Sequence, residues 1–425
     1  MKPVLSILIL LGMLSAPCAP QSLAGGHQGD RRAELRRQME ALASDLLPQI
    51  AKMNGFDRYQ PVRIEVKDKA ELREMLIEEL RAVPGSDLFR RASRTLAELG
   101  YWPRGYDLEA GMRDMLIEVM GGGYDQRRNV FYALVDLPPQ MQEPTQQKII
   151  AAHELTHALQ DQREDMSPHA LRGMTDADYE HLYNGVIEGM AYLSMMAISQ
   201  GAPIRQASDP TPMLQGARKA MEANPHLVAF AQSPLVLKAS LFGYALDGVR
   251  FCRAWLEDHP DGHLVSVLDR LPASGEQIIH YDKYIADDRP AVIDLRELTQ
   301  RLPKDWRPYY ENNLGEFAVR VLCETHDASR AIADTVAAGW DGCRIRAFET
   351  EQGQIVVVGL SIWDRERDAQ EFQGGLSSIL SGFRDPGDWE TQANGRRVSF
   401  VLGIKEPAAR RLALNALADV RIEPS

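Results

Sequence analysis

Two histidines in this sequence are spaced so that one metal ion could bind both. The stretch Ile149–Gln162 reads Ile-Ile-Ala-Ala-His-Glu-Leu-Thr-His-Ala-Leu-Gln-Asp-Gln. On a helix, residues four apart share a face, so the rings of His153 and His157 can point at a single position. Two neutral imidazoles at this spacing hold Zn²⁺ at about 2.0–2.1 Å. The spacing therefore predicts a zinc site on this segment.

The glutamate between the histidines has a different role in this pattern. Glu154 is rotated by about 100° from His153 on a helix, so it is poorly placed as a third ligand. Its carboxylate can instead reach a water molecule on the metal. Zinc lowers the pKa of such a water to about 7, and the carboxylate takes its proton as general base. His-Glu-x-x-His is the spacing of a metallopeptidase. A surface helix with two solvated histidines could have the same sequence motif. Here, however, the motif follows a predicted strand and lies on an apolar helix.

A catalytic zinc needs a third protein ligand and an open position for water. Asp161 lies two helical turns, about 12 Å, from His153, and a metal held by the two histidines is out of its reach. We expect Asp161 to orient a histidine or to bind another helix.

Glu188 is a better candidate for the third ligand. It stands in the run 184–196, Asn-Gly-Val-Ile-Glu-Gly-Met-Ala-Tyr-Leu-Ser-Met-Met, which is otherwise mostly apolar or small. Burying an ionised carboxylate there costs several kcal/mol unless it is paired or bound to a metal. Gly185 and Gly189 flank Glu188 and would let the two helices approach closely. Two alternatives stay open: Glu188 pairs with an Arg or Lys, or Glu180 is the ligand.

The elements that must position these side chains follow from apolar spacing. Helices are predicted over 145–162 and 176–200, joined by a polar loop. Ahead of them, 124–137 is typical of a tight hairpin, with aromatic ends and a polar middle. Upstream, the pattern predicts a strand over 62–66 and helices over 30–53, 70–82, 88–99 and 108–120. A mostly helical stretch then reaches about Leu302.

The sequence after Trp306 combines segments with the helical period of 3.6 residues and segments with the strand period of two residues. Helices are predicted over 315–325, 328–338, 365–380 and 406–417, and strands over 344–350, 354–363 and 397–402. We therefore predict an α+β fold, with a predominantly helical catalytic domain that carries a small sheet over 25–305. A small C-terminal α+β domain follows over 306–425.

Composition narrows the class of protein. Apolar residues make up 44% of the 425 residues and charged residues 25%, which is ordinary for a soluble globular chain. With 48 Lys and Arg against 60 Asp and Glu, the formal net charge is −12. An acidic chain without a long basic run is a poor candidate for binding nucleic acid.

The first residues predict an export signal over 1–24. Lys2 supplies a positive start, Val4–Leu14 is almost unbroken apolar sequence, and Ala16, Ala19 and Ala24 offer small residues for cleavage. An apolar stretch of about eleven residues is too short for a membrane span, which needs about twenty. We therefore expect a periplasmic or extracellular protein without a transmembrane span. Cys18 would allow lipid attachment, as in a lipoprotein, but Pro17 directly before it disfavours this modification.

Export implies an oxidising compartment, in which thiols can pair. Beyond Cys18, three cysteines remain: Cys252, Cys323 and Cys343. At most one intramolecular bridge can form, and Cys323 and Cys343 are the closest pair in sequence. The alternative is three buried apolar thiols.

The motif and the downstream glutamate together resemble a known group. His153-Glu154-x-x-His157 followed by Glu188-Gly189-x-Ala191 is similar to the gluzincins, zinc metallopeptidases with two histidines and a downstream glutamate. The resemblance implies a zincin-like fold with an edge strand ahead of the active helix, which pairs with an extended substrate. The predicted hairpin 124–137 is located where that strand belongs.

A closer resemblance is to a set of exported bacterial proteins. They share the phrases His-Glu-Leu-x-His-Ala-Leu-Gln-Asp-Gln and Glu-Gly-x-Ala, found here at 153–162 and 188–191. Further similar phrases are Gly123-Tyr124-Asp125, Tyr244-x-x-x-Gly248, Gly339-Trp340-x-Gly342, and Ser274-x-Glu276-Gln277-Ile278-x-His280-x-x-Lys283-Tyr284.

Peptide hydrolysis passes through a tetrahedral oxyanion, which a His or Tyr donor beside the metal can stabilise. Candidate donors are His280, Tyr284, Tyr244 and Tyr124, and we take His280 as the oxyanion stabiliser. The alternative for His280 is a structural histidine bonded to its neighbours.

The sequence thus predicts an exported zinc-dependent metallopeptidase that cleaves a peptide or protein substrate. His153, His157 and Glu188 bind zinc, and Glu154 is the general base. The alternative from another class is a catalytically silent zincin-fold binding protein, with a structural metal or a blocked cleft. An open fourth position on the metal separates the two.

Overall fold

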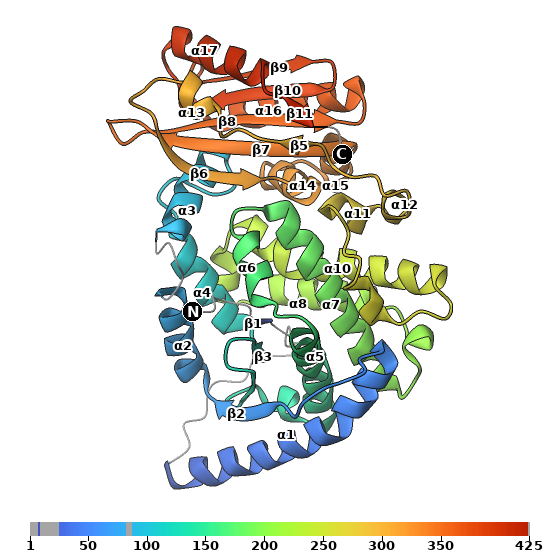
Figure 1. Cartoon of the computed structure of the whole chain (residues 1–425). Coiled ribbons are helices and arrows are strands. Elements are labelled where there is room, and N and C mark those ends of the chain that lie inside the picture. Colours follow the sequence, from blue (N-terminus) through green and yellow to red (C-terminus); the bar gives the residue numbers. More distant parts are fainter. Residues whose placement is uncertain (1–6, 9–24, 82–86, 424–425) are drawn as a thin grey trace.

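The computed structural model describes residues 7–8, 25–81 and 87–423. The chain folds into a helical body and a C-terminal sheet domain that is stacked on one end of it (Figure 1). The predicted export signal, with Cys18 and its cleavage region, lies outside the described residues apart from Ile7–Leu8. The predicted α+β class with a mainly helical body is confirmed.

The helical body contains both predicted motif helices. The histidine motif lies on α5 (Pro144–Arg163) and Glu188 lies on α7 (Ala177–Gln200), with the short α6 (Ser167–Gly173) between them. The other helices are α1 (Gly25–Asn54), α2 (Lys69–Arg81), α3 (Leu88–Leu99), α4 (Leu108–Val119), α8 (Thr211–Glu222), α9 (Val228–Gln232), α10 (Leu235–Asp258), α11 (Gly275–Ile279) and α12 (Tyr281–Ile285). Short 3-10 turns cover Pro139–Gln142, Ile204–Gln206 and Leu264–Val267.

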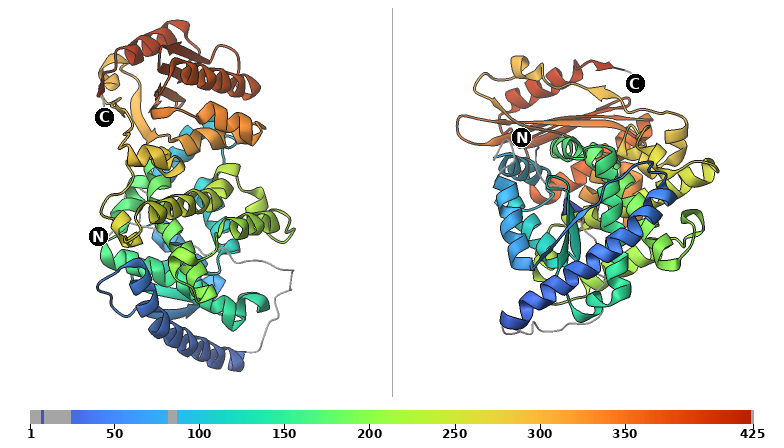
Figure 2. Two further views of the ribbon diagram at one scale, coloured as in Figure 1. Left: turned by 90° about the vertical axis from the view of Figure 1, so that its right-hand side faces the viewer. Right: turned by 60° about the horizontal axis from the view of Figure 1, so that its bottom comes forward.

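A small sheet lies beside α5. Its strand order is β1 (Ile7–Leu8), β3 (Gly122–Asp125), β4 (Val130–Leu134), β2 (Arg63–Lys67). The strands β3 and β4 form the predicted antiparallel hairpin, and β2 runs parallel to β4. Both hairpin strands are buried throughout, because α5 packs on β3 and α1 packs on β2 and β4. The second view in Figure 2 shows α1 crossing this end of the body.

The segment around the histidines is buried on every side. All eleven residues from 150 to 160 are buried, so α5 is a central helix of the core. It packs against α1, α7 and the sheet. A helix buried all round must satisfy its polar side chains inside the protein, which is why the partners of its histidines and glutamate matter.

The glycines beside Glu188 pack against α10. A Cβ on Gly189 would lie 2.4 Å from the carbonyl oxygen of Gly248, and a Cβ on Gly248 would lie 1.7 Å from that of Gly185. We expected Gly185 and Gly189 to bring the two motif helices together, and this expectation is wrong. They instead permit the close approach of α7 and α10, and this contact explains the Tyr244-x-x-x-Gly248 phrase.

The C-terminal domain is an antiparallel sheet covered on both faces. Its strand order is β6 (Arg307–Asn313), β7 (Trp340–Glu349), β8 (Ile355–Trp363), β10 (Arg397–Leu402), β9 (Trp389–Asn394). One hydrophobic core lies between the sheet and three helices, α14 (Glu316–Thr325), α15 (Arg330–Ala337) and α16 (Glu366–Phe383). The other core lies between the sheet and two helices, α13 (Leu298–Arg301) and α17 (Pro407–Ala418). Along β8, Val357 faces the first core and Val356 and Val358 face the second, so the strand is buried at every position.

The segment before residue 306 belongs to the C-terminal domain by its contacts. Strand β5 (Val292–Ile293) pairs with β11 (Ile422–Glu423), and α13 packs against α17. The expected boundary at 306 therefore cuts through this unit, whose packing begins near residue 291. Apolar periodicity of so short a segment does not reveal which core it joins.

A charged cluster connects the body to the C-terminal domain. The Lys283 ammonium lies 2.7 Å from a carboxylate oxygen of both Glu276 and Asp364, which comes after β8. Arg320 on α14 pairs with Asp247 on α10 at 3.3 Å. Glu276, Asp247 and Arg320 are buried, so removing the partner of any of them would leave an uncompensated buried charge. The Ser274-to-Tyr284 phrase thus contributes to domain attachment.

Of the two alternatives for Cys252, Cys323 and Cys343, the structure shows three buried free thiols, and Cys323 and Cys343 form no bridge. Burial raises the pKa of Cys323 to about 11 and that of Cys343 to about 12, which keeps both thiols protonated near neutral pH. No helix in the described part of the chain is long and apolar enough to cross a membrane.

The glycine contact between α7 and α10 predicts a strong size limit at residue 248. Replacing Gly248 by Ala places a methyl group against the Gly185 backbone, which must shift. We expect Gly248→Ala to lower the free energy of unfolding by about 1–3 kcal/mol, measured by urea denaturation.

Gly216 provides the matched control. It is an exposed position in α8 with no atom within 4 Å of an added Cβ. Gly216→Ala should leave stability unchanged or raise it by up to about 1 kcal/mol. A Gly248→Ala protein as stable as the wild type would show that α7 and α10 are not in close backbone contact.

Candidate metal site

Three predicted ligands converge between α5 and α7. The Nε2 atoms of His153 and His157 lie 3.0 Å apart. Glu188 places Oε2 3.4 Å from His153 Nε2 and Oε1 3.7 Å from His157 Nε2. Within the described residues, this group of His, Cys, Asp and Glu side chains is the one whose ligand atoms could hold a metal ion. The choice of Glu188 over Glu180 agrees with this geometry.

The spacing of the three donor atoms fits a small metal ion. Ligands about 2.0–2.1 Å from a tetrahedral zinc are separated by about 3.3 Å along the tetrahedron edges. The two histidine nitrogens are 3.0 Å apart, and the nearest carboxylate oxygens of Glu188 are 3.4 Å from His153 Nε2 (Oε2) and 3.7 Å from His157 Nε2 (Oε1), so these contacts lie on either side of this value. Two imidazole nitrogens and one carboxylate oxygen also form a donor set suited to a divalent transition metal. The residues therefore fit a bound ion.

Burial sets the protonation states that a metal site needs. Both histidine side chains are fully buried, which lowers the pKa of His153 to about 3 and that of His157 to about 4. Both rings are therefore neutral near pH 7, the state in which an imidazole nitrogen can bind a metal. Burial raises the pKa of Glu188 to about 7, with His157 acting in the opposite direction. A cation among the three groups would supply the charge that an ionised Glu188 requires.

Glu154 lies beside this group without joining it. Its side chain is completely buried on α5, and it is absent from the set of possible ligands, as its helical position predicts. A buried carboxylate next to a metal site is a typical arrangement for a general base. Glu154 is therefore not one of the three residues that could bind the ion.

Gln160 is a site residue that the sequence analysis missed. Its Oε1 lies 2.8 Å from Nδ1 of His157, and its Nε2 donates to the backbone carbonyl of Ile187 at 3.0 Å. The amide thus fixes the ring of His157, leaves Nε2 as the ligand atom, and connects α5 to α7 directly before Glu188. The signal was present, because Gln160 follows His157 by three residues and shares its face.

Other aromatic and acidic residues support the histidines. The ring of Tyr192, one turn after Glu188, lies edge-on to His153 with centroids 4.7 Å apart. Asp161 accepts hydrogen bonds from the Tyr124 hydroxyl and the Met166 amide, and thereby attaches α5 to β3 and the following loop. Asp161 is not one of the ligands, as expected. The residue that orients a histidine is Gln160.

The four candidate oxyanion donors lie in different places. His280 bonds to Glu316 at 3.0 and 3.1 Å, and this carboxylate raises the pKa of His280. The hydroxyl of Tyr284 donates to the Arg270 carbonyl. The assignment of His280 as oxyanion stabiliser stays a prediction; its observed contact is structural.

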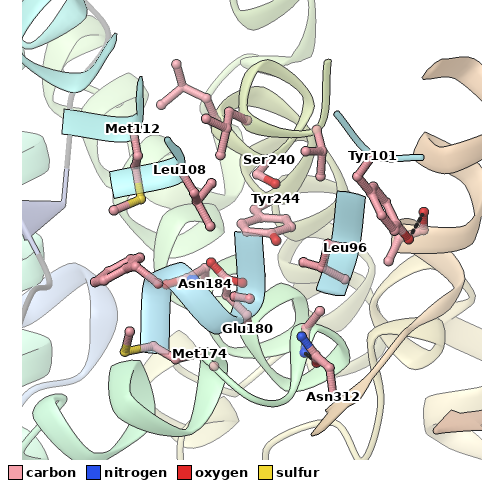
Figure 3. A pocket seen from close by; sticks show the side chains of 18 of the residues that line it. Leu96, Tyr101, Leu108, Met112, Met174, Glu180, Asn184, Ser240, Tyr244 and Asn312 are labelled. Carbon is pink, nitrogen blue, oxygen red and sulfur yellow. Dashed lines mark hydrogen bonds between the residues drawn. The ribbon is translucent and has the colours of Figure 1, made fainter. Parts of the chain in front are cut away.

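A cavity of about 370 Å³ reaches the site from the side of Glu188. Glu188 and Tyr244 both line it, so Tyr244 is the candidate donor that shares this space with a ligand residue. The walls come from α3, α4, α7 and α10 of the body and from β6 and α14 of the C-terminal domain. Figure 3 shows Tyr244 facing Asn184 and Glu180 across the cavity.

Comparisons with known proteins match only the C-terminal domain. A family model described as a domain of unknown function (DUF8575) matches residues 305–413. No curated protein matches the chain. No solved structure matches it either. The match begins just before β6, so it covers the five-stranded sheet and most of its helices.

The role of Gln160 can be tested through metal affinity. Gln160→Leu keeps the size of the side chain but removes the bond to His157, so the ring loses its fixed orientation. We expect a 10- to 100-fold lower affinity for Zn²⁺, measured by competition with a chromophoric chelator.

Gln162→Leu is the control, since Gln162 is on the same helix but bonds to the backbone of Gln60 at the surface. It should bind zinc as the wild type does. Equal affinities for both variants and the wild type would exclude a role of Gln160 in supporting a metal ligand.

Proposed function

We propose that this chain is an exported zinc-dependent metallopeptidase of the gluzincin type. The observation that carries the proposal is the convergence of His153, His157 and Glu188 from two adjacent helices. Catalytic zinc sites commonly have three protein ligands and a free position, whereas structural sites commonly have four. The described residues contribute three to this set. Export is inferred from the apolar pattern at the start of the sequence.

The chemistry assigned to the protein side chains follows from their positions. When bound, zinc would polarise the substrate carbonyl and make the attacking water more acidic. Glu154 accepts the proton of that water and passes it to the leaving amine. Its burial beside His153 excludes bulk solvent, which strengthens this proton transfer. Tyr244 is a candidate donor to the developing oxyanion, because it lines the same cavity as Glu188.

The hairpin supports the binding of an extended peptide. Strand β3 pairs with β4 on one side, and on the other side it pairs antiparallel with β1 through Ile7–Asp125 and Leu8–Tyr124. The outer edge of β3 can therefore accept a further strand. Asp161 attaches this strand to the histidine helix through Tyr124. A substrate strand that replaces β1 would run along the edge next to α5 by β-augmentation.

Substitution of Glu154 tests the mechanism. Glu154→Gln keeps the shape of the side chain but cannot accept the proton. We expect about 10²- to 10⁴-fold slower cleavage, with zinc still bound at one equivalent. Cleavage is measured by mass-spectrometric profiling of a peptide library with and without a chelator, and zinc by elemental analysis of the same samples.

Glu74→Gln is a suitable control, because Glu74 is exposed on α2. It should cleave the library at the wild-type rate. Full activity of Glu154→Gln with zinc bound would contradict the mechanism. A wild-type protein that binds zinc but cleaves none of the peptides would instead favour the silent binding protein.

A further inference from the structure

The cavity beside Glu188 is mainly apolar and is built by both domains. Leu96, Met112 and Leu241 are among the body residues that line it, and Leu314 and Phe317 come from the C-terminal domain. Its volume of about 370 Å³ is within the range of small-molecule and peptide side-chain sites. In Figure 3, the apolar side chains of Leu96, Leu108, Met112 and Met174 lie around Glu180 and Asn184, which belong to a polar strip on α7.

That polar strip consists of Glu180, Asn184 and Glu188. These residues are four apart on α7, so they share one helix face and extend from the metal ligands into the cavity. Eight residues separate Glu180 from Glu188, which corresponds to about 12 Å along the helix axis. A molecule held at the metal site can therefore extend along this face and reach Glu180.

Glu180 is the acidic group of the cavity that is left without a counter-charge. Among the described residues, two carboxylates and no lysine or arginine line the cavity. Glu188 belongs to the metal set, but Glu180 forms no ion pair within 25–81 and 87–423. Two nearby buried carboxylates do have such a partner: Glu276 has Lys283 and Glu316 has His280. Burial raises the pKa of Glu180 to about 7, and a positive neighbour would favour its charged form.

We propose that this cavity binds an apolar segment of the substrate and that Glu180 pairs with a cationic group on it, about 12 Å from the metal ligands along α7. The inference rests on the proposed peptidase function and adds a substrate class to it. An extended peptide advances about 3.3 Å per residue, so the cation is three or four residues from the site. An ammonium or guanidinium group can come from a Lys or Arg side chain or from the free amino terminus.

Four peptides with one apolar core separate these sources. Two carry a single cation, one as a free amino terminus and one as a lysine with the terminus acetylated. The third has norleucine and an acetylated terminus and is neutral; the fourth has glutamate in place of lysine. Peptide binding is measured by fluorescence polarisation to zinc-loaded Glu154→Gln protein, and cleavage by kcat/KM of the wild type.

With the wild-type residue at 180, at least one cationic peptide should bind about tenfold or more tightly than the neutral peptide. Glu180→Gln should reduce this preference to less than twofold, and Glu180→Lys should shift it to the glutamate peptide. Glu257→Gln, an exposed position on α10, is the matched control and should keep the preference. Zinc content shows that each variant retains its fold.

Two outcomes would overturn the inference: no preference for either cation with Glu180 present, or an unchanged preference in zinc-loaded Glu180→Gln. The proposed function fails separately, if none of the peptides is cleaved. Binding to the Glu154→Gln protein still reports the role of Glu180 in that case, because it requires no turnover.

Discussion

The site depends on the cost of burying a carboxylate and two imidazoles in one place. One ligand atom from each of His153, His157 and Glu188 lies within 4.8 Å of the other two, between two core helices. Burial alone pushes the histidines to the neutral form and opposes the ionised form of Glu188. A divalent cation reverses this opposition, because it attracts all three donor atoms at once. The arrangement is thus understandable as a metal site and costly without one.

The remaining structure fixes the helices that carry these groups. Gln160 connects His157 to the backbone of α7, and Asp161 connects α5 to the hairpin. On the other side of α7, Gly189 and Gly248 permit direct backbone contact with α10. The C-terminal domain, although remote in sequence, closes the cavity that reaches Glu188. Ligand geometry and access to the site are therefore consequences of the whole fold.

Much of this arrangement is predictable from local pattern. The spacing of the two histidines and the isolated Glu188 in an apolar run indicate the ligand set. The regular spacing of apolar residues predicts most of the helices and strands. What could not be predicted depends on partners distant in sequence. Tertiary contacts decide three such features: the helix against which Gly185 packs, the hydrophobic core that segment 291–305 joins, and the bond from His280 to Glu316. Strands β6 and β9 were missed because partly exposed, polar sequences lack a clear alternation.

X-ray absorption at the zinc edge of the purified full chain tests the ligands of the metal most directly. We expect one zinc per chain, with two imidazole nitrogens and one or two oxygens at about 2.0–2.1 Å. In His157→Ala, the spectrum should show one imidazole fewer. A spectrum with sulfur ligands, a fourth protein side chain, or no bound zinc would contradict this expectation.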